Sequence, residues 1–183
     1  MNSKYKTSSA AVLSPLSAKS TLLNHVLHQK ISITSRKPQT TRHRILGIKT
    51  IDANQFVYVD TPGMHKSQKK AINRMMNQTA TSALDGVDVV LFVVERLVFN
   101  EEDQIVLEAL RKVKVPVLLL INKCDLLDSR ERLLPHIERL SKFRDFAEII
   151  PLSVLGGHNI DTVESCVKKY LPFGPFMYPE DQI

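Results

Sequence analysis

The sequence predicts a three-layer α/β domain built around a mostly parallel sheet. Short apolar runs rich in β-branched residues alternate along the chain with amphipathic stretches, which is the order produced by repeated strand and helix units. Three of the apolar runs are apolar throughout their length, as is typical of strands that are covered on both faces. The connections between them are short and contain few glycines. We therefore expect helices on both faces of the sheet and a ligand site at the carboxyl ends of its strands.

Six strands and five helices are expected from this pattern. Asn100 precedes an acidic first turn in one of the helices, and we interpret it as an N-cap whose acidic neighbours complement the helix dipole. We give these acids a structural role rather than a catalytic one. The expected strands are residues 9–13, 42–50 (less regular), 55–60, 87–94, 115–121 and 148–152. The expected helices are residues 19–27, 69–84, 101–112, 129–141 and 159–170.

The composition is that of one ordinary domain. The chain has 183 residues, of which 43% are hydrophobic and 24% charged, close to the usual ~100 to 200 residues per domain. The longest apolar runs, residues 87–94 and 113–121, are shorter than the ~18 residues of a membrane span, and no signal-peptide pattern is found. Cys124 and Cys166 lack a metal-ligand spacing. We expect a cytoplasmic protein without a transmembrane segment, a disulfide framework or a zinc site.

Basic residues are concentrated in the first third of the chain. Residues 1–51 contain nine Lys and Arg and no Asp or Glu, whereas residues 52–183 contain 16 basic and 19 acidic residues. Such an asymmetry indicates an anionic partner, namely phosphate, nucleic acid or an acidic membrane surface, and a solvated basic face explains it equally well. The charge narrows the class of partner without choosing within it.

A first polar motif directly follows the expected strand at 55–60. The Asp60 carboxylate at a strand end can reach Mg²⁺, usually through water, and Gly63 lets a backbone N–H approach a terminal phosphate. The same four residues, Asp60 to Gly63, also make a good turn. Their meaning therefore depends on the motifs around them.

A second and stronger motif follows the expected strand at 115–121. An ionised Asp125 accepts hydrogen bonds from guanine N1–H and its exocyclic amine, whereas adenine presents an acceptor at N1, so the carboxylate selects guanine. We expect Lys123 to lay its methylene stem along the base and Asn122 to brace neighbouring loops, the alternative being a polar turn that closes a buried strand. Backbone N–H groups after the last strand, which by themselves are a weak signal, are expected to meet guanine O6 at Ser153, Val154 and Leu155.

A third motif opens the first expected helix. Lys19 can neutralise the β- and γ-phosphates, the Ser20 hydroxyl can ligate Mg²⁺, and the helix N-terminus supplies N–H groups and positive potential. The segment at 31–44 is polar, basic and free of acids. It predicts a loop in which Thr40 or Thr41 closes over the metal.

Together these motifs resemble the G domains of the Era family of ribosome-assembly GTPases, in the Ras-like P-loop class. The resemblance extends over about residues 11–181, and its strings around the first switch are far more specific than a generic phosphate-loop match. The matching segments are Lys19–Asn24, Gln29–Lys37, Gln39–Arg44, Asp60–Gly63, Asn122–Asp125 and Tyr178–Asp181.

The resemblance implies a six-stranded sheet with one antiparallel edge strand, GTP or GDP bound with Mg²⁺, and two switch regions. In the family an RNA-binding KH domain follows and engages the 3′ end of small-subunit ribosomal RNA. Implied partners are thus this RNA and the ribosomal particle, with peripheral association at the inner membrane. The implied domains are a tail at 1–7, a G domain at 8–172, and the start of a linker to an absent KH domain at 173–183. The implied metal ligands are Ser20, Thr40, Thr41 and Asp60, and the switch residues are Gln39, Thr40, Thr41, Arg42, Asp60, Thr61, Pro62 and Gly63.

The phosphate loop departs from the family pattern G-x-x-x-x-G-K-S. Leu13 and Ala18 stand at the two glycine positions, where Gly would allow positive φ and close approach of backbone N–H groups to phosphate. Leu16 replaces the Asn that helps hold the cation in related potassium-dependent GTPases, which argues against potassium here. We expect weakened nucleotide binding. The implied phosphate-binding residues are Leu13, Ser14, Pro15, Leu16, Ser17, Ala18, Lys19, Ser20, Thr21 and Gly63.

No catalytic residue is assigned. Met64 stands where Ras-like proteins carry the Gln that orients the attacking water, an apolar position in Era-like members too. The first hypothesis is therefore a GTP-binding switch that hydrolyses GTP slowly in small-subunit assembly. The alternative is a degenerate G domain with little nucleotide binding that acts as a module contacting RNA or the ribosome. An unrelated phosphate-binding α/β protein is a third hypothesis, against which the strand-end order of the motifs argues.

Overall fold

The computed structural model describes residues 6–13, 22, 25, 44–60, 84 and 86–178. Strands in this part of the chain form a six-stranded sheet in the order β2-β3-β1-β4-β5-β6. The strands are β1 (Lys6–Leu13), β2 (Arg44–Ile51), β3 (Asn54–Asp60), β4 (Val89–Glu95), β5 (Val117–Asn122) and β6 (Glu148–Pro151). The helices are α4 (Glu101–Leu110), α5 (Leu133–Ser141) and α6 (Ile160–Lys169), with short 3₁₀ helices η1 (Cys124–Leu126) and η2 (Arg130–Arg132).

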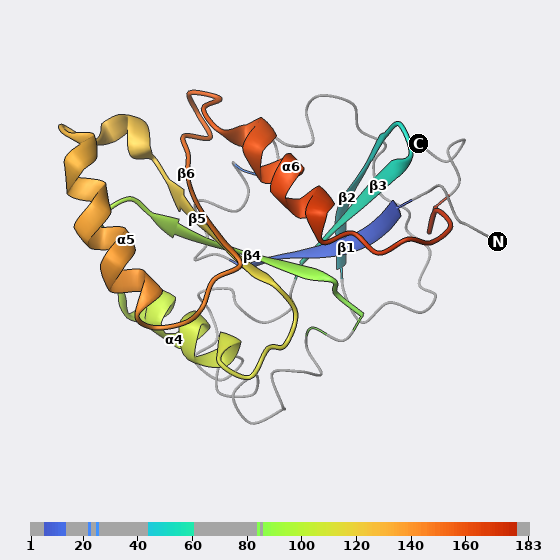
Figure 1. Cartoon of the computed structure of the whole chain (residues 1–183), viewed down its shortest axis with the longest axis horizontal. Helices are drawn as coiled ribbons and strands as arrows, with labels where there is room; N and C mark the ends of the chain where they lie inside the picture. Colours follow the sequence, from blue (N-terminus) through green and yellow to red (C-terminus); the bar gives the residue numbers. More distant parts are fainter. Residues whose placement is uncertain are drawn as a thin grey trace.

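Five of the six strands are parallel and the edge strand β2 is antiparallel to β3 (Figure 1). This confirms the sheet that the resemblance implied. Because parallel strands end on the same side, one edge of the sheet carries the last residues of all five. We call it the carboxyl edge, and it consists of Leu13, Asp60, Glu95, Asn122 and Pro151.

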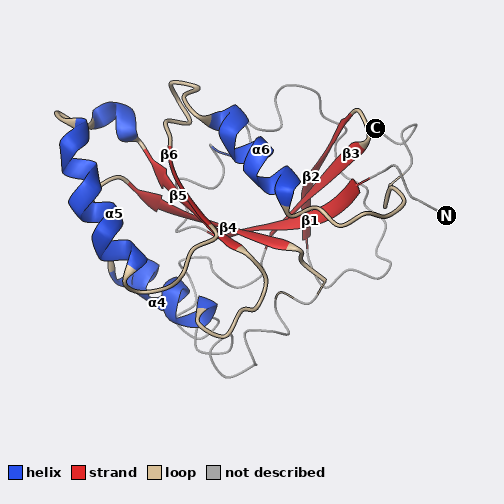
Figure 2. Cartoon of the chain, in the orientation of Figure 1, coloured by secondary structure: helices blue, strands red, loops and turns tan. Residues whose placement is uncertain are grey.

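Helices cover both faces of the sheet, as expected: α4 and α5 lie on one face and α6 lies on the other (Figures 1 and 2). The central strand β4 explains why its sequence is apolar throughout. Val89, Leu91 and Val93 pack on the α6 side, whereas the alternate residues Val90 and Phe92 pack on the side of α4 and α5. Since both sets are almost fully buried, neither face can carry polar side chains.

The start of α4 follows the sequence prediction closely. The Asn100 Oδ1 atom accepts a hydrogen bond from the Asp103 N–H at 3.0 Å, and the Asp103 carboxylate accepts one from the Asn100 N–H at 2.9 Å. This reciprocal capping box satisfies two N–H groups that a helix end leaves without partners. The structural interpretation of this acidic cluster is confirmed.

Several predicted boundaries are wrong. The helix expected at 129–141 is divided into η2 and α5, and the helix expected at 69–84 does not include Leu84, which lies in a bend. In the helix expected at 19–27, Leu22 and His25 are helical, and the remaining residues lie outside the described part. Strand β1 begins at Lys6 rather than at residue 9, because its polar first residues pair with β3 from Asn54 onward.

The segment after α6 packs against the amino end of the sheet. Thr7 donates its N–H to the Pro172 carbonyl at 3.2 Å and its hydroxyl to the Pro175 carbonyl at 2.9 Å. The fully buried Gln55 side chain exchanges two hydrogen bonds with the Tyr178 backbone, at 2.8 and 3.0 Å. The domain boundaries expected at residues 7 and 173 therefore fall inside packed structure.

Two basic side chains of the front third have partners within the domain. Lys49 in β2 is buried and forms an ion pair with Glu164 in α6, and the Lys6 ammonium lies 4.7 Å from the centre of the Phe173 ring. Of these two residues, only Lys49 has its charge balanced by a carboxylate in the part of the domain that the structure describes. Of the helices that the structure describes, none combines the length and apolar character needed to cross a bilayer.

Candidate functional site

Asn122 joins the two loops that follow β5 and β6. Its side chain is buried, with 3% exposed, and its Oδ1 atom accepts hydrogen bonds from the Lys123 N–H at 2.7 Å and the Val154 N–H at 3.1 Å. A further backbone hydrogen bond, from Cys124 N–H to the Leu152 carbonyl at 3.0 Å, crosses the same gap. The amide is therefore a brace between neighbouring loops, as expected from the sequence.

Lys123 extends from the end of β5 to the end of β4. Its backbone is left-handed, with φ 64° and ψ 32°, and its Nζ atom lies 2.8 Å from Oε1 of Glu95. Sequence reasoning missed Glu95 because a single acid at a strand end has no motif. Only the structure shows the parallel register that places Glu95 directly opposite Asn122.

Asp125 lies in η1 and is exposed to solvent. None of the three residues of η1 is buried, so this carboxylate lies at the surface of the domain. A water-exposed carboxylate at the carboxyl edge is accessible to a ligand. The adjacent Cys124 thiol donates to the Ile121 carbonyl at 3.1 Å, and burial raises its pKa, so it is a packing residue rather than a reactive one.

The loop after β6 leaves one backbone donor available. The Ser153 N–H is bonded to the His158 carbonyl at 3.2 Å, and the Val154 N–H is bonded to Asn122. The third N–H, of Leu155, has no partner in the part of the chain that the structure describes, and its side chain is 80% exposed. Of the three N–H groups that we expected to meet guanine O6, only that of Leu155 is free to do so.

Gly156 is required by the tight packing of this loop. Its N–H donates to the Ser153 hydroxyl oxygen at 3.0 Å. A Cβ at this position would lie 2.7 Å from Nδ1 of His158 and 3.0 Å from Oγ of Ser153, which is closer than van der Waals contact allows. The loop that presents the Leu155 donor is thus held by contacts that only glycine permits.

Of the residues expected to bind phosphate and metal, the structure describes only the backbone of Leu13 and Asp60. Leu13 ends β1 opposite Phe92, and Asp60 ends β3 opposite Val12, so these two strand ends are neighbours on the carboxyl edge. Among the described residues, no group of three or more His, Cys, Asp or Glu side chains is placed to hold a metal. The other predicted residues lie outside the described part of the chain: Ser14, Pro15, Leu16, Ser17, Ala18, Lys19, Ser20, Thr21, Gln39, Thr40, Thr41, Arg42, Thr61, Pro62 and Gly63.

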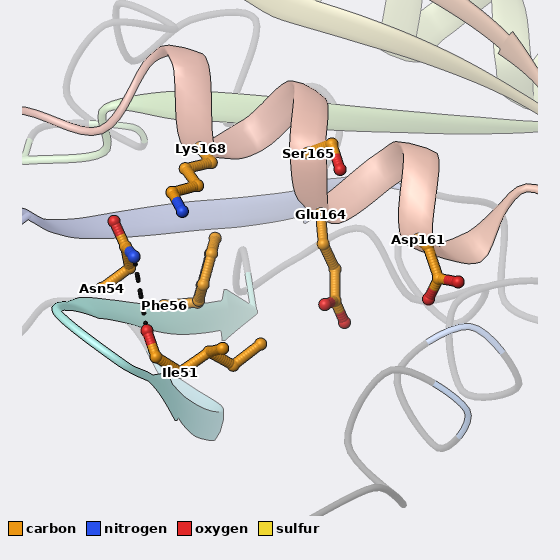
Figure 3. Close-up of a pocket in the computed structure, with 7 residues that line it drawn as sticks. All are labelled: Ile51, Asn54, Phe56, Asp161, Glu164, Ser165 and Lys168. Carbon is orange, nitrogen blue, oxygen red and sulfur yellow. Dashed lines mark hydrogen bonds between the residues drawn. The ribbon is translucent and has the colours of Figure 1, made fainter.

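A surface pocket of about 190 Å³ lies at the opposite end of β3 from Asp60 (Figure 3). It is formed between the turn that joins β2 to β3 and helix α6, and includes Asn54, Glu164 and Lys168. In Figure 3 the Lys168 ammonium lies at the Asn54 end, whereas the Asp161 and Glu164 carboxylates lie farther along α6. Of the predicted site residues that the structure describes, none lines this pocket, so it is distinct from the described part of the predicted nucleotide site.

Comparison with known proteins agrees with this geometry. Residues 17–123 match the family described as 50S ribosome-binding GTPase. GTPase Era of Marinobacter nauticus is 59% identical over 174 residues, which cover 95% of this chain and 57% of that protein. GTPase Era of Azotobacter vinelandii is 56% identical over the same length, covering 95% of this chain and 58% of the relative. The chain thus spans somewhat more than half the length of these relatives.

Solved structures share the fold of this chain. A crystal structure of Era in complex with MgGDPNP and nucleotides 1506–1542 of 16S ribosomal RNA has a TM-score of 0.75 and 35% identity, covering 97% of this chain and 61% of that one. A variant of Aquifex aeolicus Era bound to GDP·AlF4⁻ also has a TM-score of 0.75 and 35% identity, over 96% of this chain and 60% of that one. The G domain of the T. maritima FeoB iron transporter, at 17% identity and a TM-score of 0.62, shares the fold.

Proposed function

Because this chain belongs to the family of 50S ribosome-binding GTPases, we propose that it is the guanine-nucleotide-binding domain of an Era-type GTPase that hydrolyses GTP slowly during assembly of the small ribosomal subunit. The observation that carries the proposal is the Asn122 brace, which holds the loop bearing Asp125 against the loop bearing Leu155. Those two loops carry the groups that can read a guanine base from different sides.

The base-reading step follows from the donors and acceptors at this edge. The exposed Asp125 carboxylate accepts hydrogen bonds from guanine N1–H and the exocyclic amine, each charge-assisted and worth ~1.5 to 3 kcal/mol. The Leu155 N–H supplies the donor for O6. Adenine offers a lone pair at N1 and an amine at the O6 position, so both contacts become unfavourable. Selectivity for guanine by several powers of ten is the expected result.

The phosphate and metal part of the proposal rests on residue chemistry. Asp60 ends the strand next to β1, and together with the hydroxyls of Ser20, Thr40 and Thr41 it forms an all-oxygen donor set of the kind Mg²⁺ prefers. When bound, Mg²⁺ neutralises charge on the phosphates. Potassium is not expected to be needed, because Leu16 replaces its Asn ligand.

The rest of the proposal concerns the rate of GTP hydrolysis and the partners of the domain. Met64 stands after Gly63, where a Gln would orient the attacking water, so we expect hydrolysis to rest on positioning and electrostatics and to be slow. Small-subunit ribosomal RNA is the proposed macromolecular partner, engaged through the basic segment at 31–44. A cytoplasmic location accords with these partners, whereas peripheral contact with the inner membrane rests on the basic front third alone. Residues 8–172 are proposed as the G domain, and residues 6–7 and 173–178 pack against each other and against its sheet.

Titration calorimetry with GDP and ADP, in Mg²⁺ with and without potassium, tests the proposal. We expect GDP to bind in preference to ADP, although more weakly than in a relative with an intact phosphate loop. In a matched variant, Asp125→Asn, the side-chain amide donates to O2 of xanthine and accepts from its N1–H, so XDP binding should rise as GDP binding falls. Equal affinity for GDP and ADP would contradict the assignment of the base-reading loop.

A triple variant separates the proposal from the degenerate-domain alternative, which Leu13 and Ala18 suggest. Restoring glycine at both positions, together with Leu16→Asn, should raise GDP affinity because the loop regains its backbone N–H contacts. If the restored variant binds no better and neither protein binds GDP, the domain acts without nucleotide. Binding of a ribosomal RNA fragment would then carry the function, and its affinity must fall with added salt.

A further inference from the structure

Glu95 is tied to the base-reading loop, although no motif contains it. It ends β4 directly opposite Asn122 in the parallel register, and the next residue, Arg96, donates its N–H to the Asn122 carbonyl at 2.8 Å. The ends of β4 and β5 are therefore joined through the backbone. Only one Glu95 contact involves its side chain among those the structure gives, and that contact is the ion pair with Lys123 at 2.8 Å.

This ion pair fixes the direction of a flexible side chain. The backbone of Lys123 is held by the Asn122 amide, and its ammonium is held by Glu95, so the methylene stem between them is fixed at both ends. β4 lies between β5 and β1 in the sheet, which places the stem on the side of β5 that faces the strand leading to the phosphate loop. A nucleotide spanning from Asp125 to that loop must pass this stem.

We propose that Glu95 is a positioning residue for guanine nucleotides, acting by holding the Lys123 stem in place as a surface for the flat face of the purine. The inference rests on the proposed function. Without Glu95 the Lys side chain is free before binding and must be ordered when nucleotide binds, which costs affinity. The benefit of Glu95 is thus pre-organisation, and it requires no contact between Glu95 and the ligand.

The role in binding is separable from a role in folding. The two side chains of the pair are 33% and 37% exposed, and ion pairs of that exposure contribute little to stability. Removal of Glu95 should therefore leave the Tm nearly unchanged. The contact of the Lys123 stem with the flat face of the purine can also be separated from the contact of Asp125 with its edge. The stem does not distinguish guanine from adenine, whereas Asp125 is proposed to do so.

Charge and positioning predict opposite changes in nucleotide affinity when Glu95 is replaced by Gln. Glu95→Gln removes a negative charge near the site of an anionic ligand, which by electrostatics alone tightens nucleotide binding. Positioning predicts weaker binding, by about three- to ten-fold, from the ordering cost of one long side chain. Glu101→Gln is a charge-matched control, because Glu101 is an exposed acid at the start of α4, the helix that follows β4.

The experiment is a double-variant cycle measured by calorimetry with MgGDP and MgADP, using Glu95→Gln, Lys123→Ala and the double variant of the whole chain. We expect Glu95→Gln to weaken both nucleotides by the same factor, Glu101→Gln not to weaken them, and Glu95→Gln to have no further effect once Lys123 is Ala. Unchanged or tighter binding in Glu95→Gln overturns the inference, as does a loss that persists in the Lys123→Ala background.

A second measurement keeps this inference distinguishable from the proposed function. In nucleotide-free protein, the ¹H–¹⁵N signal of the Lys123 ammonium should be protected from exchange by its carboxylate partner, and Glu95→Gln should abolish that protection while the Tm stays constant. A protected signal together with no GDP binding by the wild type refutes the proposed function, and the inference with it. GDP binding without a protected signal refutes the inference alone.

Discussion

The Asn122 amide provides the most quantitative test of how this site is assembled. Asn122→Ala removes the Oδ1 acceptor from two backbone donors, the Lys123 N–H at 2.7 Å and the Val154 N–H at 3.1 Å. Each hydrogen bond contributes ~1 kcal/mol net, and a buried donor left without a partner costs a further ~1 to 3 kcal/mol. Val154 is 1% exposed, so water cannot readily reach its N–H.

The expected loss is therefore about 2 to 4 kcal/mol in the free energy of unfolding. For a domain of this size that corresponds to a fall in Tm of roughly 5 to 15 °C. Urea unfolding of nucleotide-free protein measures it without any contribution from ligand. Ser141→Ala is the control, because it removes one hydrogen bond whose groups are exposed to water, from the Ser141 hydroxyl to the Glu138 carbonyl, and it should lose less than half as much. If Asn122→Ala costs under 1 kcal/mol, the amide is not the brace described above.

Three further perturbations are predicted. Gly156→Ala places a Cβ against His158 Nδ1 at 2.7 Å, so it should lower both the Tm and GDP affinity, and pairing it with His158→Ala should restore part of the Tm. Arg144→Ala removes donors to the Leu110 and Val113 carbonyls at the end of α4, and chemical denaturation should show a loss of ~1 to 3 kcal/mol. Burial, and then the Arg139 charge, lower the pKa of His136 below 6.5 in the folded state. The unfolded chain therefore takes up the proton first, so the free energy of unfolding should be fully present above pH 6.5 and fall below it, and His136→Leu should reduce that slope in urea titrations.

The sheet was predictable because its signals are local. Residues 87–94 are apolar throughout and form a strand buried on both faces, and the N-cap at Asn100 is read directly from neighbouring residues. The predicted guanine-binding motif was located by its position after a strand, and parallel strands necessarily end on one side of a sheet. Boundaries were less predictable: the polar start of β1 at Lys6 carries no periodic signal and is a strand only because β3 pairs with it.

The candidate site shows the same distinction between features set by local sequence and features set by tertiary contacts. Sequence alone determined which residue types follow each strand, and hence the prediction that Asn122 to Asp125 read a guanine base. Tertiary structure decided that Asp125 is exposed, that the Val154 N–H is occupied, and that Lys123 is held by Glu95. Local sequence patterns reflect the secondary structure of each segment. Contacts between residues far apart in the chain depend on strand order and register, which are settled only when the strands pack together.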